Sequence, residues 1–491
     1  MKALIIGTGM AGLATALRLL SRGYEVEMVE AFSQPGGRLN QLKKDGFVFD
    51  MGPTFFSMSY EFDELAEDSG IKMPFKKMAL DPIYTVWYDT PGKKFKIYRD
   101  FEKLEKQFEH YEPRFREKMI RYMKSSGRLY SDTEKRIIKR NFNSLSDYIA
   151  GLMGVPLRHL PKVARNFWQE VGRYFSSDEV KEILSLVAFF LGGTPFDTPA
   201  VYTMLSFTEF VHDGYYNIEG GMYKIVEGLV EEIKKRGGKM SYNVRITGYE
   251  PEHDGVGCFV DSRGKAYKAD VYIVNADAAS FRGKVMNRKK FRDSRLDKMK
   301  WTMAPLSIYL GLNRKVPEID HHNYFLRGNF KDYANKIYKN KINLDQPYYY
   351  VNVVSRYNHN AAPEGHEAIY ILVPVPDRRF KPDWNDSRTI SENIFADLSQ
   401  RTGFNLNKHI VSKTILTPVE WENMFGLHRG SGLGLAHNLS QIGWFRPSNC
   451  DEVFKNLFYT GSSTIPGTGV PIAVISSKLV MEQIDKVYGT L

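Results

Sequence analysis

The sequence predicts an α/β fold in which a parallel-sheet domain is interrupted by an inserted α+β region. Three observations support this prediction. A strand, a glycine-rich turn, a helix and a second strand occur within the first 30 residues, a strand, a glycine-rich loop and a helix end the chain, and the stretches between them have other periodicities. With 491 residues, the chain is long enough for two or three domains.

The first glycine-rich turn has the spacing of a dinucleotide site. The apolar run 3–6 predicts a buried parallel strand, Gly7, Gly9 and Gly12 follow it as G-x-G-x-x-G, and residues 11–20 have helical periodicity. Gly7 permits the tight turn, Gly9 lets backbone approach a pyrophosphate, and Gly12 lets the helix pack on the sheet with its positive end towards the phosphates. We therefore predict a Rossmann-like unit here.

A carboxylate follows the second strand of this unit. Residues 24–29 predict that strand, and Glu30 lies 18 residues after Gly12. A spacing of about 20 is typical of the acidic group that binds a ribose 2′-hydroxyl. A glycine-rich turn in another kind of α/β unit is the alternative. A signal peptide is disfavoured by Arg18 and Arg22 and by the lack of a small-residue cleavage site.

The next glycines indicate which dinucleotide is bound. Gly36, Gly37 and Arg38 follow the second strand, and GFVFDMGPT occupies 46–54. The glycine pair offers bare backbone N–H groups and Arg38 supplies a fixed cation, with a surface salt bridge as the alternative role of this arginine. The succession resembles the amine-oxidase and carotenoid-desaturase superfamily of flavoproteins, which implies that it continues an FAD site.

The other end of the chain offers a second glycine-rich loop. Residues 456–472 read NLFYTGSSTIPGTGVPI, a strand followed by a loop, and a helix is predicted over 473–487. The positive N-terminus of that helix suits the pyrimidine ring of a flavin, which becomes negative on reduction. A βα unit that only closes the sheet is the alternative.

Composition limits the other classes of site. Cys258 and Cys450 are the only cysteines, which excludes a disulfide framework or a cysteine metal site and fits a reducing cytoplasm. The histidines are scattered without metal-ligand spacing, so that no metal is expected. The formal net charge is +11, but no nucleic-acid-binding module is recognised, and an anionic bilayer surface is the other partner that such a charge fits.

One segment is a candidate for membrane contact. Residues 99–140 contain 13 Lys or Arg against 8 Asp or Glu, and apolar residues recur there at spacings of three and four. This pattern predicts an amphipathic helix whose apolar stripe contacts either a bilayer or a domain core. The stripe comprises Phe101, Leu104, Phe108, Tyr111, Phe115, Met119 and Tyr122.

No transmembrane helix is predicted. The most apolar candidate, 183–196, is too short to span a bilayer and is interrupted by Gly192, Gly193 and Pro195. We expect this segment to line an apolar cavity or to pack in a core.

The remaining patterns divide the chain into two interleaved sets of segments. Helical periodicity dominates much of the first inserted stretch, and β-type runs are frequent in the second. Residues 1–75, 214–288 and 427–491 are assigned to a discontinuous FAD-binding domain. Residues 76–213 and 289–426 are assigned to the inserted region, which the resemblance described next implies is the domain that binds the substrate and associates with a membrane.

Six motifs along the chain carry a closer resemblance: GTGMAGL, GGRLNQ, GFVFDMGPT, NIEGGMYKIVEGL, IVNADA and NLFYTGSSTIPGTGVPIAVISSK. Together they resemble carotenoid desaturases of the phytoene-desaturase type, most of all the hydroxycarotenoid 3,4-desaturases of flavobacteria. This implies a Rossmann-like FAD domain of the glutathione-reductase and amine-oxidase kind, and a cytoplasmic enzyme, peripheral to the inner membrane, that draws a polyene into an apolar tunnel. It also implies FAD contacts at Gly7, Gly9, Gly12, Glu30, Gly37, Arg38, Thr54, Val244, Gly461, Gly469, Val470 and Pro471.

Related flavin proteins differ from this sequence at defined positions. Amine oxidases carry a glutamate after the equivalent of Gly461, whereas this chain has Ser462. Disulfide reductases need a second G-x-G-x-x-G for NAD(P), and the GSGLG run at 430–434 lacks that spacing. Proteins like GDP-dissociation inhibitors share the architecture without FAD and are the non-enzyme alternative. A purified protein that never holds flavin would favour them.

The resemblance implies removal of two hydrogens from adjacent polyene carbons, with hydride transfer to the flavin. The faces of Tyr215 and Tyr216 are candidates for stabilising a polyene cation, with a role as core aromatic residues as the alternative. Glu209, His212 and Asp213 are candidates for accepting the proton or binding a polar substrate end.

The substrate class also follows from the resemblance. The best match is C-3,4 desaturation of a 1-hydroxylated, γ-carotene-derived carotenoid on the myxol or saproxanthin route. Phytoene desaturation and saturation of a polyene or retinoid are the alternatives. Oxygen or a quinone is expected to accept the electrons.

Overall fold

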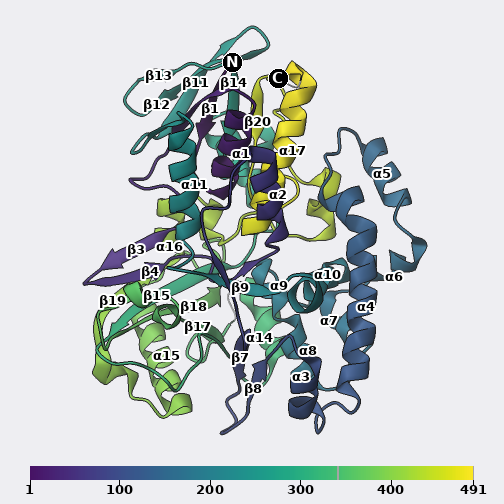
Figure 1. Cartoon of the computed structure of the whole chain (residues 1–491), viewed down its shortest axis with the longest axis vertical. Coiled ribbons are helices and arrows are strands. Elements are labelled where there is room, and N and C mark those ends of the chain that lie inside the picture. The colour runs from purple at the N-terminus through teal and green to yellow at the C-terminus, as the bar shows by residue number, and fades with distance from the viewer. Residues whose placement is uncertain (340–341, 490–491) are drawn as a thin grey trace.

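The computed structural model describes residues 1–339 and 342–489 (Figure 1). Its first layer is a five-stranded sheet to which both ends of the chain contribute, and the neighbouring strands are parallel. Across the sheet the order is β10 (Lys239–Ser241), β2 (Glu25–Val29), β1 (Lys2–Ile6), β14 (Val271–Val274) and β20 (Leu457–Tyr459).

Both faces of this sheet are buried, as is typical of parallel strands. Alternate residues of β1 point to opposite sides, so that Ala3 and Ile5 pack against three helices, whereas Leu4 and Ile6 pack beneath a small antiparallel sheet. The helices are α1 (Met10–Ser21), α11 (Lys224–Lys235) and α17 (Val470–Tyr488), and the small sheet contains β11 (Ile246–Glu252), β12 (Gly255–Asp261) and β13 (Ala266–Tyr267).

A second, seven-stranded sheet is built from the inserted segments. Its order is β19 (Ile410–Leu416), β15 (Ala304–Leu312), β18 (Glu367–Val375), β17 (Tyr349–Val353), β16 (His322–Phe325), β7 (Tyr84–Trp87) and β8 (Lys94–Ile97). Only β16 and β7 pair in parallel among these described strands. One face packs on α15 (Ser387–Thr402), and the other presents aromatic side chains such as Tyr350 to a separate cluster.

A group of helices lies beside the second sheet (Figure 1). Two π-helical turns, at 134–138 and 208–212, follow α4 and α10. The helices are α3 (Phe101–Phe108), α4 (Phe115–Thr133), α5 (Leu145–Met153), α6 (Leu160–Val163), α7 (Phe167–Val171), α8 (Asp178–Ser185), α9 (Val187–Phe190) and α10 (Met204–Phe207).

Two small sheets connect these parts. One pairs β3 (Gln41–Lys44) with β4 (Phe47–Asp50), and the other has the order β5 (Phe56–Ser57), β9 (Tyr215–Ile218) and β6 (Lys77–Ala79). The remaining α-helices are α2 (Tyr60–Ser69), α12 (Ala278–Lys284), α13 (Asp293–Leu296), α14 (Phe330–Lys336) and α16 (Pro418–Phe425).

The predicted α/β fold with a Rossmann-like domain is confirmed. The strands of the parallel sheet fall within 1–75, 214–288 and 427–491, and those of the seven-stranded sheet fall within 76–213 and 289–426. The domain boundaries themselves stay a prediction. Residues 340–341 and 490–491, which belong to two of these ranges, lie outside the described residues.

The amphipathic segment contacts a core and not a bilayer. It forms α3 and α4, and Leu104, Phe108, Phe115 and Met119 are buried in the cluster beneath the second sheet. Of the seven stripe residues, Tyr111 is the one classed as exposed. The interpretation of this stripe as a membrane face is therefore wrong, because its apolar surface is already covered. Within residues 1–339 and 342–489, no helix is long and apolar enough to cross a membrane.

Candidate cofactor and substrate site

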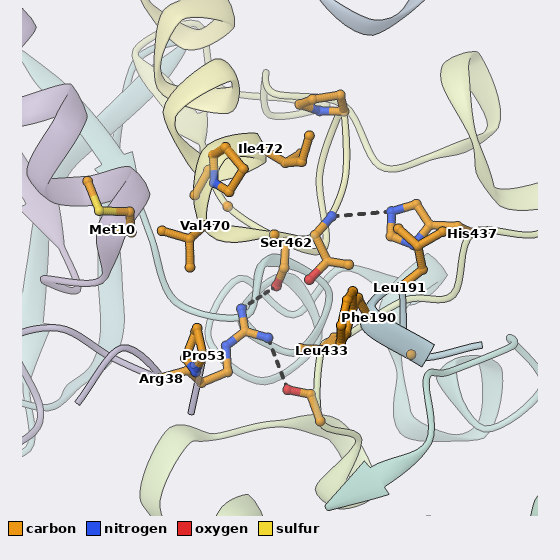
Figure 2. Close-up of a pocket in the computed structure, with 18 of the residues that line it drawn as sticks. Met10, Arg38, Pro53, Phe190, Leu191, Leu433, His437, Ser462, Val470 and Ile472 are labelled. Atoms are coloured by element: carbon orange, nitrogen blue, oxygen red, sulfur yellow. Dashed lines mark hydrogen bonds between the residues drawn. The ribbon is translucent and has the colours of Figure 1, made fainter. Parts of the chain in front are cut away.

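A cavity of about 1140 Å³ is lined by residues of both large sheets and of the helices beside them. The loops that follow β1 and β20 form one part of its wall, and side chains of β16 and β17 form another. Figure 2 shows the part near Arg38 and Ser462. Of the twelve residues predicted to contact FAD, all but Gly12 line this cavity.

The three glycines after β1 are required by close contacts. Gly7 has φ of +102°, and a Cβ atom there would lie 3.0 Å from the carbonyl carbon of Asn275. A Cβ on Gly9 would lie 2.8 Å from the Asn275 side-chain nitrogen, and one on Gly12 would lie 2.5 Å from the Gly7 carbonyl oxygen. Helix α1 begins at Met10 and points its N-terminus at the cavity. This cradle fits a diphosphate, because side chains at these positions would close it.

Glu30 stands at the end of β2 in a fixed orientation. Its carboxylate accepts hydrogen bonds from the Thr8 backbone N–H and the Thr8 hydroxyl, both at 2.7 Å, and from the Phe32 N–H at 3.0 Å. The Val244 N–H donates to the Glu30 backbone carbonyl at 2.8 Å, which places Val244 beside the carboxylate at the cavity wall. The donor and acceptor groups at this end suit a ribose.

Arg38 connects the N-terminal and C-terminal loops. Its guanidinium donates to the Ser462 hydroxyl at 2.7 Å and to the Gly432 carbonyl at 3.2 Å (Figure 2). Among the described residues, no carboxylate lies within ion-pair distance of it. Burial lowers the pKa of Arg38, and nearby Asp277 partly offsets this effect. The alternative of a surface salt bridge is wrong, and a positive charge remains at the wall of the cavity.

The C-terminal loop brings a helix terminus to the same place. Gly461 and Gly469 have φ of +109° and +129°, and Val470 and Pro471 form the first turn of α17. All four residues line the cavity. The positive end of this 19-residue helix therefore lies close to the α1 end of the cavity wall.

Arg446 stabilises this loop through hydrogen bonds, and the sequence pattern did not identify this arginine. The side chain is buried, and this burial lowers its pKa to about 10. A single arginine in an irregular segment carries no recognisable spacing, so that only the fold reveals its partners. Its guanidinium donates to five backbone carbonyls: Thr464 at 2.8 Å, Leu435 at 3.0 Å, Gln441 at 3.2 Å, Ala436 at 3.3 Å, and Ser462.

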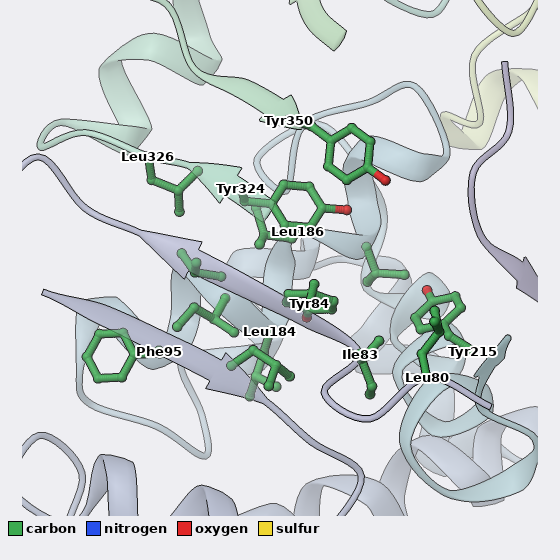
Figure 3. Packing of buried hydrophobic residues seen from close by; sticks show 14 of the residues in the cluster. Leu80, Ile83, Tyr84, Phe95, Leu184, Leu186, Tyr215, Tyr324, Leu326 and Tyr350 are labelled. Atoms are coloured by element: carbon green, nitrogen blue, oxygen red, sulfur yellow. The ribbon is translucent and has the colours of Figure 1, made fainter. Parts of the chain in front are cut away.

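The wall formed by the second sheet and the helices is aromatic, and Figure 3 shows Tyr215, Tyr324 and Tyr350 of this wall within the buried hydrophobic cluster to which they also belong. The Phe55 ring centre lies 4.9 Å from that of Tyr215 and 5.3 Å from that of Phe190, and the Tyr324 and Tyr350 rings are 5.1 Å apart. All five residues line the cavity. Phe190 belongs to the segment 183–196, which we expected to line an apolar cavity or to pack in a core. Part of this segment lines the cavity, and another part, with Ile183 and Leu184, is buried in the core cluster.

The four predicted catalytic residues do not reach this wall. None of Glu209, His212, Asp213 and Tyr216 is among the described residues that line the cavity. Tyr215 and Tyr216 are neighbours in β9, so that their side chains point to opposite faces, and only Tyr215 faces the cavity. The Tyr216 hydroxyl instead donates to the Asp213 backbone carbonyl at 3.1 Å.

The other three candidates have local partners. Asp213 accepts from the Ser59 N–H at 2.7 Å and the Ser59 hydroxyl at 2.8 Å. His212 is exposed and stacks on Phe207 with 5.7 Å between ring centres. Glu209 is buried close to Tyr84, and burial raises its pKa to about 8. Their proposed roles in proton transfer or substrate binding stay predictions.

Comparisons with known proteins agree with this geometry. A family model described as flavin containing amine oxidoreductase matches residues 10–484. The chain is 31% identical to a zeta-carotene-forming phytoene desaturase of Myxococcus xanthus, over 98% of this chain and 93% of that one. It is 29% identical to a carotenoid 3,4-desaturase of Haloarcula japonica, over 97% of each. The solved structure of putrescine oxidase bound to putrescine is similar with a TM-score of 0.64 at 14% identity, over 99% of both chains, which shows the fold alone.

Gly12→Ala should impair retention of FAD. The new methyl group would meet the Gly7 carbonyl oxygen at 2.5 Å, so that α1 must move away from the cradle. We expect at least about tenfold weaker binding of FAD, equivalent to about 1.4 kcal/mol. Flavin absorbance per polypeptide after purification and titration of FAD into the stripped protein measure this. Gly248→Ala is the control, since nothing lies within 4 Å of its Cβ position. Equal affinity in both variants would contradict the prediction.

Arg446→Met should destabilise the folded protein. Five carbonyls lose their shared donor, and we expect the free energy of unfolding to fall by about 3 kcal/mol or more. Arg446→Lys keeps the charge but not the array of donors and should recover only part of the loss. Chemical denaturation of the purified variants measures the change. Arg388→Met, at an exposed i,i+4 pair with Glu392, is the control and should cost less than about 0.5 kcal/mol.

Proposed function

The chain belongs to the flavin containing amine oxidoreductases, among the carotenoid desaturases of the phytoene-desaturase type, and we propose that it introduces the C-3,4 double bond into a 1-hydroxylated acyclic end of a carotenoid. It is an FAD-dependent oxidoreductase. The observation that carries the proposal is that one cavity has a dinucleotide cradle in one part of its wall and aromatic side chains with buried hydroxyl groups in another.

The chain's own residues would bind FAD and position the polyene. Glu30 and Val244 would hold the ribose end, Gly9 and the N-terminus of α1 the phosphates, and Gly461 and the N-terminus of α17 the ring system. When bound, FAD would supply the acceptor for a hydride, and oxygen or a quinone would afterwards accept the two electrons.

The protein's contribution to the chemistry is mainly to orient the polyene and to exclude water from it. Apolar and aromatic side chains dominate the part of the wall away from the cradle, and the rings of Phe190 and Tyr215 would stabilise a positive charge that develops on the polyene.

A buried polar group supports a hydroxylated substrate end. Tyr324 lines the cavity, and its hydroxyl is buried with no hydrogen-bond partner among the described residues. Tyr215 lines the cavity beside it, and Glu209 lies behind both phenols, close enough to raise their pKa values further. Since burial raises the pKa of Glu209 to about 8, this carboxyl group is protonated at neutral pH. In this protonated form Glu209 would not act as the base.

Phytoene desaturation is the second candidate. It is favoured by the identity of 31% to the zeta-carotene-forming phytoene desaturase of Myxococcus xanthus. A fully apolar substrate end leaves the hydroxyl of Tyr324 without a partner, which disfavours this candidate because an unpaired buried hydroxyl costs about 1–3 kcal/mol.

Tyr324→Phe should separate the two candidates. We expect kcat/KM for 1-hydroxy-γ-carotene to fall about tenfold, because the substrate hydroxyl loses one hydrogen bond, with no loss of protein stability. Conversion of phytoene and lycopene should not change. Product chromophores from cells fed each carotenoid separately, and kinetics with purified protein in detergent, measure this. Efficient conversion of phytoene but not of the hydroxylated carotenoid would establish the second candidate instead.

We further propose that α5 and α6 dock on a membrane. The exposed apolar residues of this surface, called the α5–α6 patch, include Met153, Leu157 and Leu160 with 80%, 82% and 63% of their surface accessible. Leu157 and Leu160 also line the cavity, so that the cavity reaches the surface within this patch. Exposed cations, among them Arg136 and Arg158, lie in the same region. The complete patch contains Leu145, Ile149, Leu152, Met153, Leu157, Leu160 and Val163.

This surface suits a substrate that is dissolved in lipid. A polyene would enter from the acyl chains without crossing water, and the basic groups would contact anionic headgroups, each contributing roughly 1 kcal/mol. The α5–α6 patch replaces the stripe on α3 and α4 as the proposed membrane face.

The double variant Leu157→Ser/Leu160→Ser should bind vesicles more weakly. Removing two large apolar side chains from the interface should lower the partition coefficient by about tenfold or more. Cosedimentation with vesicles of phosphatidylglycerol and phosphatidylethanolamine measures it. The matched control is Val411→Ser/Val453→Ser, which changes two exposed valines outside the patch. Equal loss in both double variants, or no loss in either, would contradict this docking surface.

A further inference from the structure

A row of hydrogen-bonded side chains leads from the cavity wall into the second sheet. The Thr54 and Tyr350 hydroxyls are 2.8 Å apart, and the Tyr350 hydroxyl is 2.5 Å from Nδ1 of His322. Thr54 and Tyr350 line the cavity, whereas His322 lies behind them. The His322 ring is stacked on Phe55, with 3.8 Å between the ring centres. The row therefore begins at the cavity and ends at an imidazole shielded from water.

The Asn352 amide fixes the direction of these hydrogen bonds. Its nitrogen donates to the His321 carbonyl at 3.0 Å and lies 3.2 Å from Nδ1 of His322. Because an amide nitrogen only donates, Nδ1 of His322 is an acceptor, and the ring proton is on Nε2. Nδ1 has one lone pair, and we assign it to the Tyr350 hydroxyl, which at 2.5 Å is closer than the Asn352 nitrogen at 3.2 Å; the Tyr350 oxygen can then accept from the Thr54 hydroxyl. All protons in the row point away from the cavity.

His322 is held in its neutral form. Burial lowers its pKa well below 6.5, and His321 lowers it further. Burial also raises the pKa of Tyr350 well above 10. Within the described part of the chain, Nε2 of His322 has no hydrogen-bond partner. Neither group is charged at neutral pH, so that the Nδ1 lone pair stays available.

The cavity wall offers few other acceptors near the aromatic side chains. The candidates Glu209, His212 and Asp213 do not line it. His159 lines it but bonds to Asp132 at 2.8 Å, and His437 accepts from the Thr468 N–H at 3.2 Å. Of the described hydrogen bonds, that of Tyr350 is the one that joins a phenol hydroxyl to an imidazole.

We propose that Tyr350 and His322 together take the proton that the polyene loses during desaturation, with Tyr350 as the catalytic residue and His322 as the group that acts through it. This inference rests on the proposed function. One C–H bond breaks with its electron pair leaving as hydride to FAD. The neighbouring C–H bond then breaks, and its electron pair becomes the new π bond.

The released proton moves to the phenol oxygen of Tyr350 as the phenol's own proton moves to Nδ1 of His322. The oxygen or quinone that later takes the two electrons also takes two protons, which restores both residues. A weak base is sufficient, because a C–H bond next to a positively charged carbon is strongly acidic. A stronger neutral base would already be protonated before the substrate arrives and unable to accept a proton. Proton transfer by a positioned side chain contributes about 10²–10⁴-fold to rate.

The experiment compares Tyr350→Phe with Tyr370→Phe in the holoenzyme. Tyr370 also lines the cavity, but its hydroxyl makes only a long contact of 3.4 Å with Ser307, so that it is a matched phenol. We expect Tyr350→Phe to lower kcat for the hydroxylated carotenoid by about 100-fold or more, with KM and FAD content unchanged. The solvent deuterium isotope effect on kcat, present in the wild type and in Tyr370→Phe, should disappear.

His322→Gln tests the second member of the pair. It also provides the test of the proton transfer if Tyr350→Phe does not fold. It should lower kcat and remove the isotope effect in the same way. Nitrogen-15 NMR of histidine-labelled holoenzyme gives a readout independent of turnover. One buried imidazole should stay neutral with its proton on Nε2 across neutral pH, and its Nδ1 signal should shift in Tyr350→Phe.

The outcomes separate this inference from the proposed function. If the wild type converts phytoene but not the hydroxylated carotenoid, the substrate assignment is wrong, and the same variants test the pair with phytoene. If the wild type converts no carotenoid, both proposals are overturned. If Tyr350→Phe and His322→Gln stay within a few-fold of an active wild type with an unchanged isotope effect, only the proton transfer is overturned. An imidazole with its proton on Nδ1 also overturns it.

Discussion

The close approach of β1, α1 and β14 is the constraint on which the rest of the structure depends. A Cβ atom on Gly7 would meet backbone atoms of Asn275, and one on Gly12 would meet the carbonyl oxygen of Gly7. The turn after β1, helix α1 and the end of β14 therefore fit together only if positions 7 and 12 carry no side chain. This contact sets the width of the cradle and directs the N-terminus of α1 into the cavity. The C-terminal loop then joins it through Arg38 and Ser462.

The same junction concentrates positive charge. Arg38 and Arg446 are both directed at Ser462, and neither has a carboxylate within ion-pair distance among the described residues. Buried cations are costly when uncompensated. A serine at position 462 preserves this charge, whereas the glutamate that amine oxidases carry there would cancel it. The two arginines and the two helix N-termini thus favour a negatively charged dinucleotide, and more so after its flavin is reduced.

The dinucleotide side of the site could be predicted from sequence because its requirements are local. Gly7, Gly12 and Glu30 serve roles set by their spacing within one βαβ unit, and the structure places Gly7 and Glu30 at the cavity and Gly12 at the helix–sheet contact. The aromatic side could not be predicted in this way. Tyr350 and His322 lie in different strands, and their contact depends on a register that the sequence pattern does not specify.

The errors of prediction have the same origin. The stripe on α3 and α4 has the periodicity of a membrane helix, but periodicity does not say what covers an apolar face. Likewise, Tyr215 and Tyr216 look equivalent in the sequence until β9 pairs with β5 and β6 and assigns them to opposite faces. Tertiary contacts made by distant segments decided both cases.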